Sequence, residues 1–267
     1  FDGGRLYHIA VKVHGYVVIE EALCASDIAT LNDAISQTVQ AFDPRQHQSV
    51  FTTTDDDQGR DEVFFRSAET VEYFLEEDAV NAQGHLNRPL EQAINKIGHA
   101  LHDHIPAIRQ LCRNPALARA FRTLGLHEPQ LWQSMVIFKK PGIGGEVRWH
   151  QDASYLHTTP ASVVGMWIAL EDADRDNGCL MVAPGMLKTI DESVTWPSDS
   201  QFKAPEVKTL EVRAGSAVFF SDHLPHASSA NRSARSRTAL TLHAADGRSV
   251  WAPENWLQRP ALGAFPL

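Results

Sequence analysis

Cysteine is scarce in this chain, and its distribution excludes the architectures that depend on it. Cys24, Cys112 and Cys179 are odd in number and far apart, and no two of them form a CxxC pair. Such a set does not suggest a disulfide framework, which is therefore disfavoured. The scarcity predicts a protein of a reducing compartment, which we expect to be the cytoplasm.

Long apolar runs are missing as well. No stretch of about 18 apolar residues occurs, so the sequence predicts neither a transmembrane helix nor a membrane partner. The chain begins at Phe1 without a methionine, and a removed organelle-targeting segment therefore stays open as an alternative to the cytoplasm.

Positive charge is in deficit. The chain has 24 lysines and arginines against 33 aspartates and glutamates, and its formal net charge is −9. A nucleic-acid binder needs a basic surface that neutralises phosphates. We therefore expect no nucleic-acid partner. Independently of the charge, we expect a small-molecule substrate, and a monomer or a weak homo-oligomer.

The first part of the chain, to about residue 128, mixes short strands with helical patterns. Residues 15–20 predict a strand, and Ser26 is a candidate N-cap for a helix whose apolar stripe runs from Ile28 to Phe42. Two more helical patterns follow near 90–104 and 106–124. Their candidate first residues include Pro106 and Pro115.

The segment 43–62 is polar and contains the run Asp55-Asp56-Asp57. Three adjacent carboxylates could bind a cation, but they lack the ligand spacing of a calcium loop. A solvated loop is the preferred interpretation.

From about residue 129 the chain changes to short runs rich in branched and aromatic residues, separated by turn residues. Such runs predict strands. They lie at 131–139, 163–170, 178–182, 209–212, 217–221 and 238–243. The pattern indicates a β-sandwich or barrel with the earlier helices packed outside it. The polar insertion at 188–207 is a candidate lid over a site.

The most informative motif is His150-Gln151-Asp152. Residues two apart in an extended segment point to the same side, so an imidazole and a carboxylate are aimed into one cavity. A third ligand is available in the segment 221–226, as His223 or His226. Two histidines and one carboxylate leave about three metal positions open, as in non-haem Fe(II) oxygenases. Taken alone, the pair also fits a surface histidine beside an ordinary carboxylate.

Arg237 lies eleven residues beyond His226 and opens a hydrophobic predicted strand. Its planar guanidinium suits the distal carboxylate of 2-oxoglutarate. The alternative is an arginine of a basic, serine-rich turn. Arg232 and Arg235 fit that alternative well, whereas Arg237 fits it less well because of the strand that it begins.

Several longer stretches carry a resemblance to a known family. They are HGYVVIEEAL (14–23), INKIGHALHDH (94–104), QSMVIFKKPGIGGEV (133–147), HQDASYL (150–156), GMWIALEDADRDNGCL (165–180), RSRTALTLH (235–243) and WAPENWLQ (251–258). These stretches resemble the phytanoyl-CoA dioxygenase (PhyH) family, most of all its branch of domain-containing proteins without an established physiological substrate. Together they are far more specific than a His-x-Asp pair.

The resemblance implies one dioxygenase domain over residues 1–267, with a helix-rich part to about 128 and a core at about 129–250. That core is a double-stranded β-helix, or cupin-like jelly roll, flanked by α-helices. The resemblance also implies a set of site residues. The iron ligands would be His150, Asp152 and His226, with the spacing to the arginine favouring His226 over His223.

The resemblance further implies that Arg237 binds 2-oxoglutarate and that Lys96, Met135 and Trp167 line its pocket. Each of these three has a plainer interpretation. Lys96 lies in a predicted helix and is otherwise expected to be solvated, and the other two are on strands, where core packing is the default.

Three features stay open. His99, His102 and His104 cluster near one predicted helix and suggest a second metal site, although a polar helix face is preferred because no further ligand is identified. Many family members have Pro-Gly-Ser-His where this chain has Pro184-Gly185-Met186-Leu187, which puts the substrate side in doubt. Arg148 is either a partner for an acidic substrate or a surface residue.

The resulting hypothesis is an Fe(II)- and 2-oxoglutarate-dependent dioxygenase that uses O2, hydroxylates an unidentified small organic substrate, and releases succinate and CO2. Family halogenases replace the aspartate by a small residue, so Asp152 favours hydroxylation. Two rivals remain: a catalytically idle metal- and 2-oxoglutarate-binding sensor, and a zinc-dependent hydrolase or cupin-like isomerase with the same His/Asp/His face. No basic groove for a CoA diphosphate stands out, so the family name does not identify the substrate.

Overall fold

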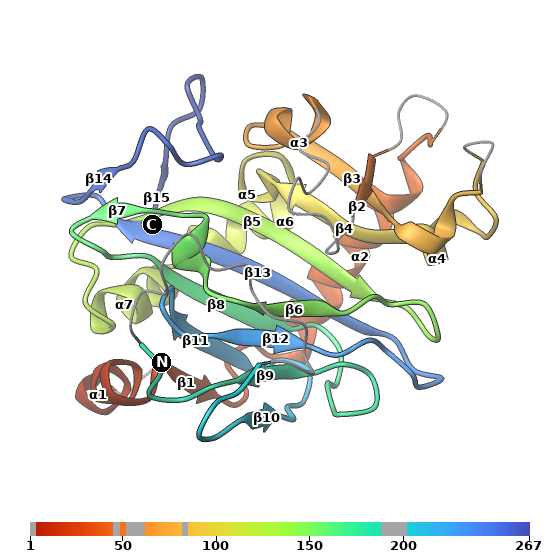
Figure 1. Ribbon diagram of the computed structural model, residues 1–267. Coiled ribbons are helices and arrows are strands. Elements are labelled where there is room, and N and C mark those ends of the chain that lie inside the picture. Colours follow the sequence, from red (N-terminus) through yellow and green to blue (C-terminus); the bar gives the residue numbers. More distant parts are fainter. Residues whose placement is uncertain (1–3, 45–48, 52–61, 82–84, 188–201) are drawn as a thin grey trace.

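Two β-sheets face each other, and helices cover the outer side of the larger sheet (Figure 1). The computed structural model describes residues 4–44, 49–51, 62–81, 85–187 and 202–267. Within these residues, strands dominate the part that follows residue 128. The predicted sheet-rich class with flanking helices is thus confirmed.

The larger sheet has the strand order β1-β11-β8-β13-β5-β4-β3-β2, and β15 pairs with β5. Its neighbours are antiparallel except β2 and β3, which are parallel. In chain order the strands are β1 (Tyr16–Ile19), β2 (Ser49–Phe51), β3 (Val71–Glu76), β4 (Ile94–His99), β5 (Pro129–Lys139), β8 (Val164–Ala169), β11 (Ala217–Ser221), β13 (Arg237–Asp246) and β15 (Phe265–Pro266).

The smaller sheet has the order β10-β9-β12-β6, and a separate pair joins β14 to β7. The strands of the smaller sheet are β6 (Val147–His150), β9 (Leu180–Val182), β10 (Lys208–Leu210) and β12 (His226–Ser228). The separate pair consists of β7 (Thr158–Thr159) and β14 (Val250–Trp251). In Figure 1 the smaller sheet lies across the face of the larger sheet that is turned away from α2.

The central strand β13 is buried along its whole length because both of its faces are covered. Leu240 and Leu242 point to one face and join the core that includes the helices. Ala239 points to the other face and packs with Val182 of the smaller sheet. The alternating positions Arg237, Ala239, Thr241 and His243 therefore share the face between the two sheets.

The helices lie mostly behind the larger sheet. The long ones are α1 (Gly4–His14) and α2 (Ala25–Gln40), followed by the shorter α3 (Glu62–Arg66), the 3-10 turn η1 (Glu77–Ala79), α4 (Leu90–Ala93), α5 (Leu101–His104), α6 (Pro106–Cys112) and α7 (Pro115–Thr123). The expected stripe of α2 is confirmed, since Leu31, Ile35 and Val39 are buried in the core. Its N-cap residue, however, is Cys24 and not Ser26, which lies inside the helix.

The predicted helix at 90–104 is wrong in its middle. Only α4 and α5 are helical, and β4 lies between them in the larger sheet, paired with β3 and β5. All six residues of β4 are buried, so the strand shows no alternation of polar and apolar residues. The spacing of Ile94, Ile97 and Leu101 therefore imitates a helical stripe.

One predicted loop and one predicted helix also differ from the structure in detail. The segment 43–62 is not entirely a loop, because β2 lies within it, and Asp55–57 fall outside the described residues. The helix predicted at 106–124 is two helices, α6 and α7. Pro106 and Pro115 begin them as expected, and Asn114 caps the second by accepting a bond from the Ala116 amide.

The insertion at 188–207 is described only from residue 202 onward. There, Phe202 stacks on Trp149 of β6, with ring centroids 4.2 Å apart. Trp149 neighbours His150 on the strand, so its side chain is on the opposite side of the smaller sheet from the histidine. No helix among the described residues is long and apolar enough to cross a membrane.

Candidate metal centre

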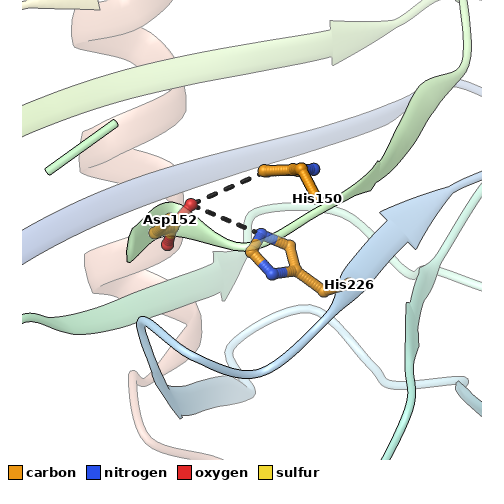
Figure 2. Close-up of side chains that lie close together, drawn as sticks. All are labelled: His150, Asp152 and His226. Atoms are coloured by element: carbon orange, nitrogen blue, oxygen red, sulfur yellow. Dashed lines mark ion pairs between the residues drawn. The ribbon is translucent and has the colours of Figure 1, made fainter. Parts of the chain in front are cut away.

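Three potential ligands converge between the two sheets (Figure 2). His150 ends β6, Asp152 follows one extended residue later, and His226 begins β12 directly opposite His150 in the antiparallel register. The Asp152 Oδ1 lies 3.6 Å from the Nε2 of each histidine, and the ligand atoms all lie within 4.8 Å of one another. The expected extended geometry of the His-x-Asp motif thus places both side chains on the same side.

Both imidazoles are held with Nε2 turned toward this cluster. The Nδ1–H of His150 donates to the Arg148 carbonyl at 2.8 Å, and that of His226 donates to the Leu224 carbonyl at 2.9 Å. A carbonyl can only accept, so these bonds place the proton on Nδ1 and leave the Nε2 lone pair available for a metal.

The cluster is buried and suited to bind a cation at neutral pH. Burial and the neighbouring His226 lower the pKa of His150 to about 4. Burial by itself raises the pKa of Asp152, but the surrounding histidines, His243 first, lower it below its ordinary value. Metal ligands must be deprotonated, so a neutral imidazole beside a carboxylate is the state that binds.

Asp152 also contacts a fourth residue that the sequence did not suggest. The Nε2 of His243, in β13, lies 3.0 Å from Asp152 Oδ2. The alternation along β13 that places Arg237 on the inner face places His243 there too, so strand periodicity is the signal that could have found it.

Arg237 is 1% exposed, and its guanidinium lies over the ring of Trp167 with 5.7 Å to the centroid. Its Nε donates to the Gly178 carbonyl at 3.1 Å, but Nη1 has no hydrogen-bond partner within the described part of the chain. Burial lowers the pKa of Arg237 to about 10, so it stays a cation at neutral pH. A buried cation with an unused donor is a fitting partner for a carboxylate of 2-oxoglutarate.

The other predicted pocket residues share the inner face of the larger sheet with Arg237. Met135, Thr241 and Trp167 lie side by side in one row across β5, β13 and β8. Lys96 lies in the next row, opposite Ile137 of β5. The structure therefore places all three predicted pocket residues on the face of the larger sheet that is turned toward the smaller sheet, from which His150 and His226 come.

Lys96 is not a solvated helix residue, contrary to its plainer interpretation. It is 7% exposed in β4, and its ammonium lies over the rings of Phe74 and Phe64, at 5.0 and 5.7 Å from the centroids. Burial lowers the pKa of Lys96 to about 7. Its position is therefore a costly one for a charged group, as is common for groups that bind a ligand.

His223 lies outside the cluster. Its Nδ1 is 2.6 Å from Asp222 Oδ1, and this hydrogen bond, against a smaller effect of burial, raises the pKa of His223. Among the described residues, the group that could hold a metal contains His226 and not His223.

The three histidines near α5 do not form a second metal group within the described residues. His99 is bonded to Ser67, His102 to Ser134 and His104 to the Glu69 carbonyl. Each ring is thus held by a different neighbour. Burial lowers the pKa of His102 to about 2, and that of His99 falls well below its ordinary value, so the two buried rings are neutral.

Arg148 is paired with Glu146, 3.6 Å away, and its side chain is one-third exposed at 33%. Its Nε is buried and has no hydrogen-bond partner among the described residues, so Arg148 is half-buried and not a fully solvated surface residue. The segment Pro184–Leu187 follows β9, and Leu187 packs beside the core between the two sheets.

The chain matches a known protein family along most of its length. The model of the family described as phytanoyl-CoA dioxygenase (PhyH) matches residues 11–239. The chain is 38% identical over 257 residues to phytanoyl-CoA dioxygenase 1 of Oryza sativa subsp. japonica, covering 92% of this chain and 90% of the relative. It is 35% identical over 272 residues to phytanoyl-CoA dioxygenase domain-containing protein 1 of Mus musculus, covering 94% of each.

Solved structures with the same fold are more distant in sequence. The epimerase SnoN, in complex with Fe3+, alpha ketoglutarate and nogalamycin RO, has a TM-score of 0.68 at 18% identity, covering 98% of this chain and 92% of SnoN. EctD from S. alaskensis with bound Fe has a TM-score of 0.67 at 20% identity, covering 95% of this chain and 80% of EctD. At these identities the likeness shows a shared fold, here the double-stranded β-helix.

Proposed function

The chain belongs to the phytanoyl-CoA dioxygenase family of 2-oxoglutarate-dependent iron dioxygenases, and we propose that it hydroxylates a small organic molecule with His150, Asp152 and His226 as the ligands of Fe(II). One observation carries the proposal: three ligand atoms converge on the same face between the sheets as a buried arginine with an unused donor. We also propose that residues 1–267 form one dioxygenase domain, which comprises the helix-rich part to about residue 128 and the β-helix core at about 129–250.

The donor set fits Fe(II). Two neutral imidazoles and one carboxylate on one side of the ion leave about three positions open for other ligands. The Nδ1 bonds of His150 and His226 to backbone carbonyls fix the rings before the ion arrives. The fit of the co-substrate rests on Arg237, whose Nη1 can donate to a carboxylate where it now has no partner within the described residues.

Bound together, Fe(II) and 2-oxoglutarate would activate O2 and supply one oxygen atom to the substrate, with release of succinate and CO2. The protein's residues bind and orient these groups. Arg237 holds the far carboxylate of the co-substrate, and its burial makes the ion pair stronger than it would be in water. Trp167 covers the guanidinium, and Lys96 and Met135 line the same face. Retention of the Asp152 carboxylate favours hydroxylation over halogenation.

The deciding experiment is a succinate assay with Fe(II) and O2, run without added substrate and then with pools of metabolites. We expect succinate formation that requires Fe(II) and O2 and that a substrate in the pools stimulates. Binding of 2-oxoglutarate without turnover would instead support the sensor, and hydrolysis of a substrate with zinc and without O2 would support the hydrolase. Arg237 speaks against the hydrolase, which has no use for a co-substrate clamp.

The ligand assignment has its own test. We expect Asp152→Ala and His226→Ala each to lower succinate formation by more than about 100-fold, since loss of a ligand removes the ion. His223→Ala is the matched control, because His223 lies three residues from His226 but outside the cluster, and we expect it to retain turnover. Wild-type rates for Asp152→Ala or His226→Ala would refute the assignment.

A further inference from the structure

We propose that His243 is a positioning residue that holds Asp152 as a one-oxygen ligand of the metal, an inference that rests on the proposed metal site. The two oxygens of Asp152 have different neighbours. Oδ1 is 3.6 Å from the Nε2 of both His150 and His226, whereas Oδ2 is 3.0 Å from the Nε2 of His243. A carboxylate only accepts, so the ring nitrogen of His243 donates.

The contact between His243 and Asp152 is built into the fold. His243 is 5% exposed in the middle of the larger sheet, with β5 on one side and β8 on the other. Asp152, by contrast, lies in a short 3-10 turn, η2 (Asp152–Ser154), at the end of the smaller sheet. The bond therefore joins the turn that carries a ligand to the most firmly paired strand of the opposite sheet.

Nothing within the described residues competes with Asp152 for His243. The Nδ1 of His243 has no hydrogen-bond partner there, so the bond to Asp152 is the one fixed polar contact of the ring. Gly165, its register partner on β8, has no side chain, and the ring of Phe220 fills that space, 6.5 Å from the His243 ring. Phe220 also packs on the ring of His226 at 4.8 Å.

Keeping Oδ2 occupied has a chemical consequence. An aspartate that chelates a metal through both oxygens takes two of its positions, whereas a one-oxygen ligand takes one. With His150 and His226, a one-oxygen Asp152 leaves three positions for a bidentate co-substrate and dioxygen. The geometry thus gives His243 a role in preserving the open side of the ion without touching the ion itself.

The test is an anaerobic titration with Co(II), a spectroscopic substitute for Fe(II), followed by visible absorption. We expect His243→Leu to weaken Co(II) binding about 10- to 100-fold, as for other residues that orient metal ligands, and to change the absorption bands that report coordination. His99→Gln is the matched control, since His99 is an equally buried histidine of the larger sheet that bonds to Ser67 instead. We expect its Co(II) affinity to equal that of the unchanged protein.

A double-mutant cycle tests whether the effect passes through Asp152. In an Asp152→Asn background, whose amide keeps one oxygen for the ion but offers His243 no second oxygen as acceptor, His243→Leu should weaken Co(II) binding no further. An equal loss in both backgrounds, or unchanged affinity and spectrum for His243→Leu, would overturn the inference. If the unchanged protein bound no Co(II), the proposed metal site itself would be refuted, and the inference with it.

A second pair of variants covers the case in which His243→Leu does not fold. His243→Gln places an amide donor near the position of Nε2, whereas the shorter His243→Asn cannot reach Asp152. We expect glutamine to retain most of the Co(II) affinity and asparagine to lose it. Equal affinities for the two variants would overturn the inference.

Discussion

Arg237 illustrates how a single residue links burial to ligand binding. A buried guanidinium is expensive unless its donors are used, and Arg237 uses Nε on the Gly178 carbonyl while Nη1 stays without a partner in the described chain. A ligand carboxylate that accepts a hydrogen bond from Nη1 would remove the free-energy cost of leaving this donor unpaired. We therefore expect Arg237 to contribute to ligand binding and not to the stability of the unliganded protein.

We expect Arg237→Lys to raise the KM for 2-oxoglutarate by about 10- to 100-fold, because an ammonium cannot bond Gly178 and a carboxylate as a planar fork does. Arg235→Lys is the matched control. Arg235 is more than half exposed and paired with Asp174 at the surface, so its conservative substitution should leave the KM unchanged. Equal KM values for both variants would remove Arg237 from the co-substrate site.

Burial of the Lys96 ammonium lowers the free energy of unfolding, and the size of this effect depends on pH. The pKa of Lys96 in the folded protein is about 7 against an ordinary value of 10.5. Between these values the unfolded chain holds a proton that the folded protein has released, so the free energy of unfolding rises with pH. Below about pH 7 the folded protein carries the full cost of the buried ammonium.

We therefore expect Lys96→Met to be more stable than the unchanged protein at pH 7, by an amount on the order of a few kcal/mol that shrinks toward pH 10. Urea unfolding of both proteins at pH 7 and pH 9.5 measures the difference. Lys140→Met is the control, because Lys140 also lies over a phenylalanine ring but is less buried. A constant difference for Lys96→Met at both pH values would contradict the argument. The same variant should bind 2-oxoglutarate more weakly.

The residues of the candidate site differ in how well the sequence could identify them. His150 and Asp152 could be predicted because a spacing of two is informative in any extended segment. Arg237 could be predicted because it begins a hydrophobic strand. His243 was missed because one histidine in a buried strand looks like a core residue, and only the position of Asp152 on the opposite sheet gives it a role.

At the scale of elements, the strands with clear turns at both ends were predicted nearly to the residue. β11 matches its expected range of 217–221, and β8 differs from its expected range by one residue at each end. The sequence of β4 indicates a helix because both faces of the strand are covered, which removes the alternation that identifies a strand. β6 and β12 were missed because they are short, and their pairing with each other depends on segments over 70 residues apart.

Gly165 gives a test of how β8 and β11 support the metal ligands. A Cβ at this position would lie 2.5 Å from the ring of Phe220, which packs on His226. We expect Gly165→Ala to lower the free energy of unfolding by about 1–3 kcal/mol through overpacking, and to weaken Co(II) binding because Phe220 must move. Urea unfolding and Co(II) titration measure the two effects.

The compensating variant for this test is Gly165→Ala combined with Phe220→Leu, whose smaller side chain makes room for the added methyl group. We expect the double variant to recover stability relative to Gly165→Ala. If the double variant were less stable than the sum of the two single changes, the contact between Gly165 and Phe220 would not be the cause.

At the scale of the whole molecule, the site exists only where the two sheets meet. His150 and His226 come from the smaller sheet, while Arg237, His243 and Lys96 come from the larger one. An unfolded chain cannot bring these residues together, so a ligand of the site binds the folded state alone. Metal and co-substrate should therefore raise the stability of the whole protein.

The order in which the ligands stabilise the protein follows from the geometry. At about 100 times its Kd, a ligand adds about 2.7 kcal/mol to the free energy of unfolding, which corresponds to a rise in Tm of about 5–10 °C for a chain of this size. We expect Co(II) alone to raise the Tm and 2-oxoglutarate to raise it further only when Co(II) is present, since the co-substrate chelates the ion.

Two variants separate the contributions of the metal and the co-substrate to this rise in Tm. Arg237→Lys should keep the rise from Co(II) and lose much of the rise from 2-oxoglutarate. Asp152→Ala should lose both, and an undiminished rise from 2-oxoglutarate in Asp152→Ala would show that the co-substrate binds elsewhere than on the ion held by His150, Asp152 and His226.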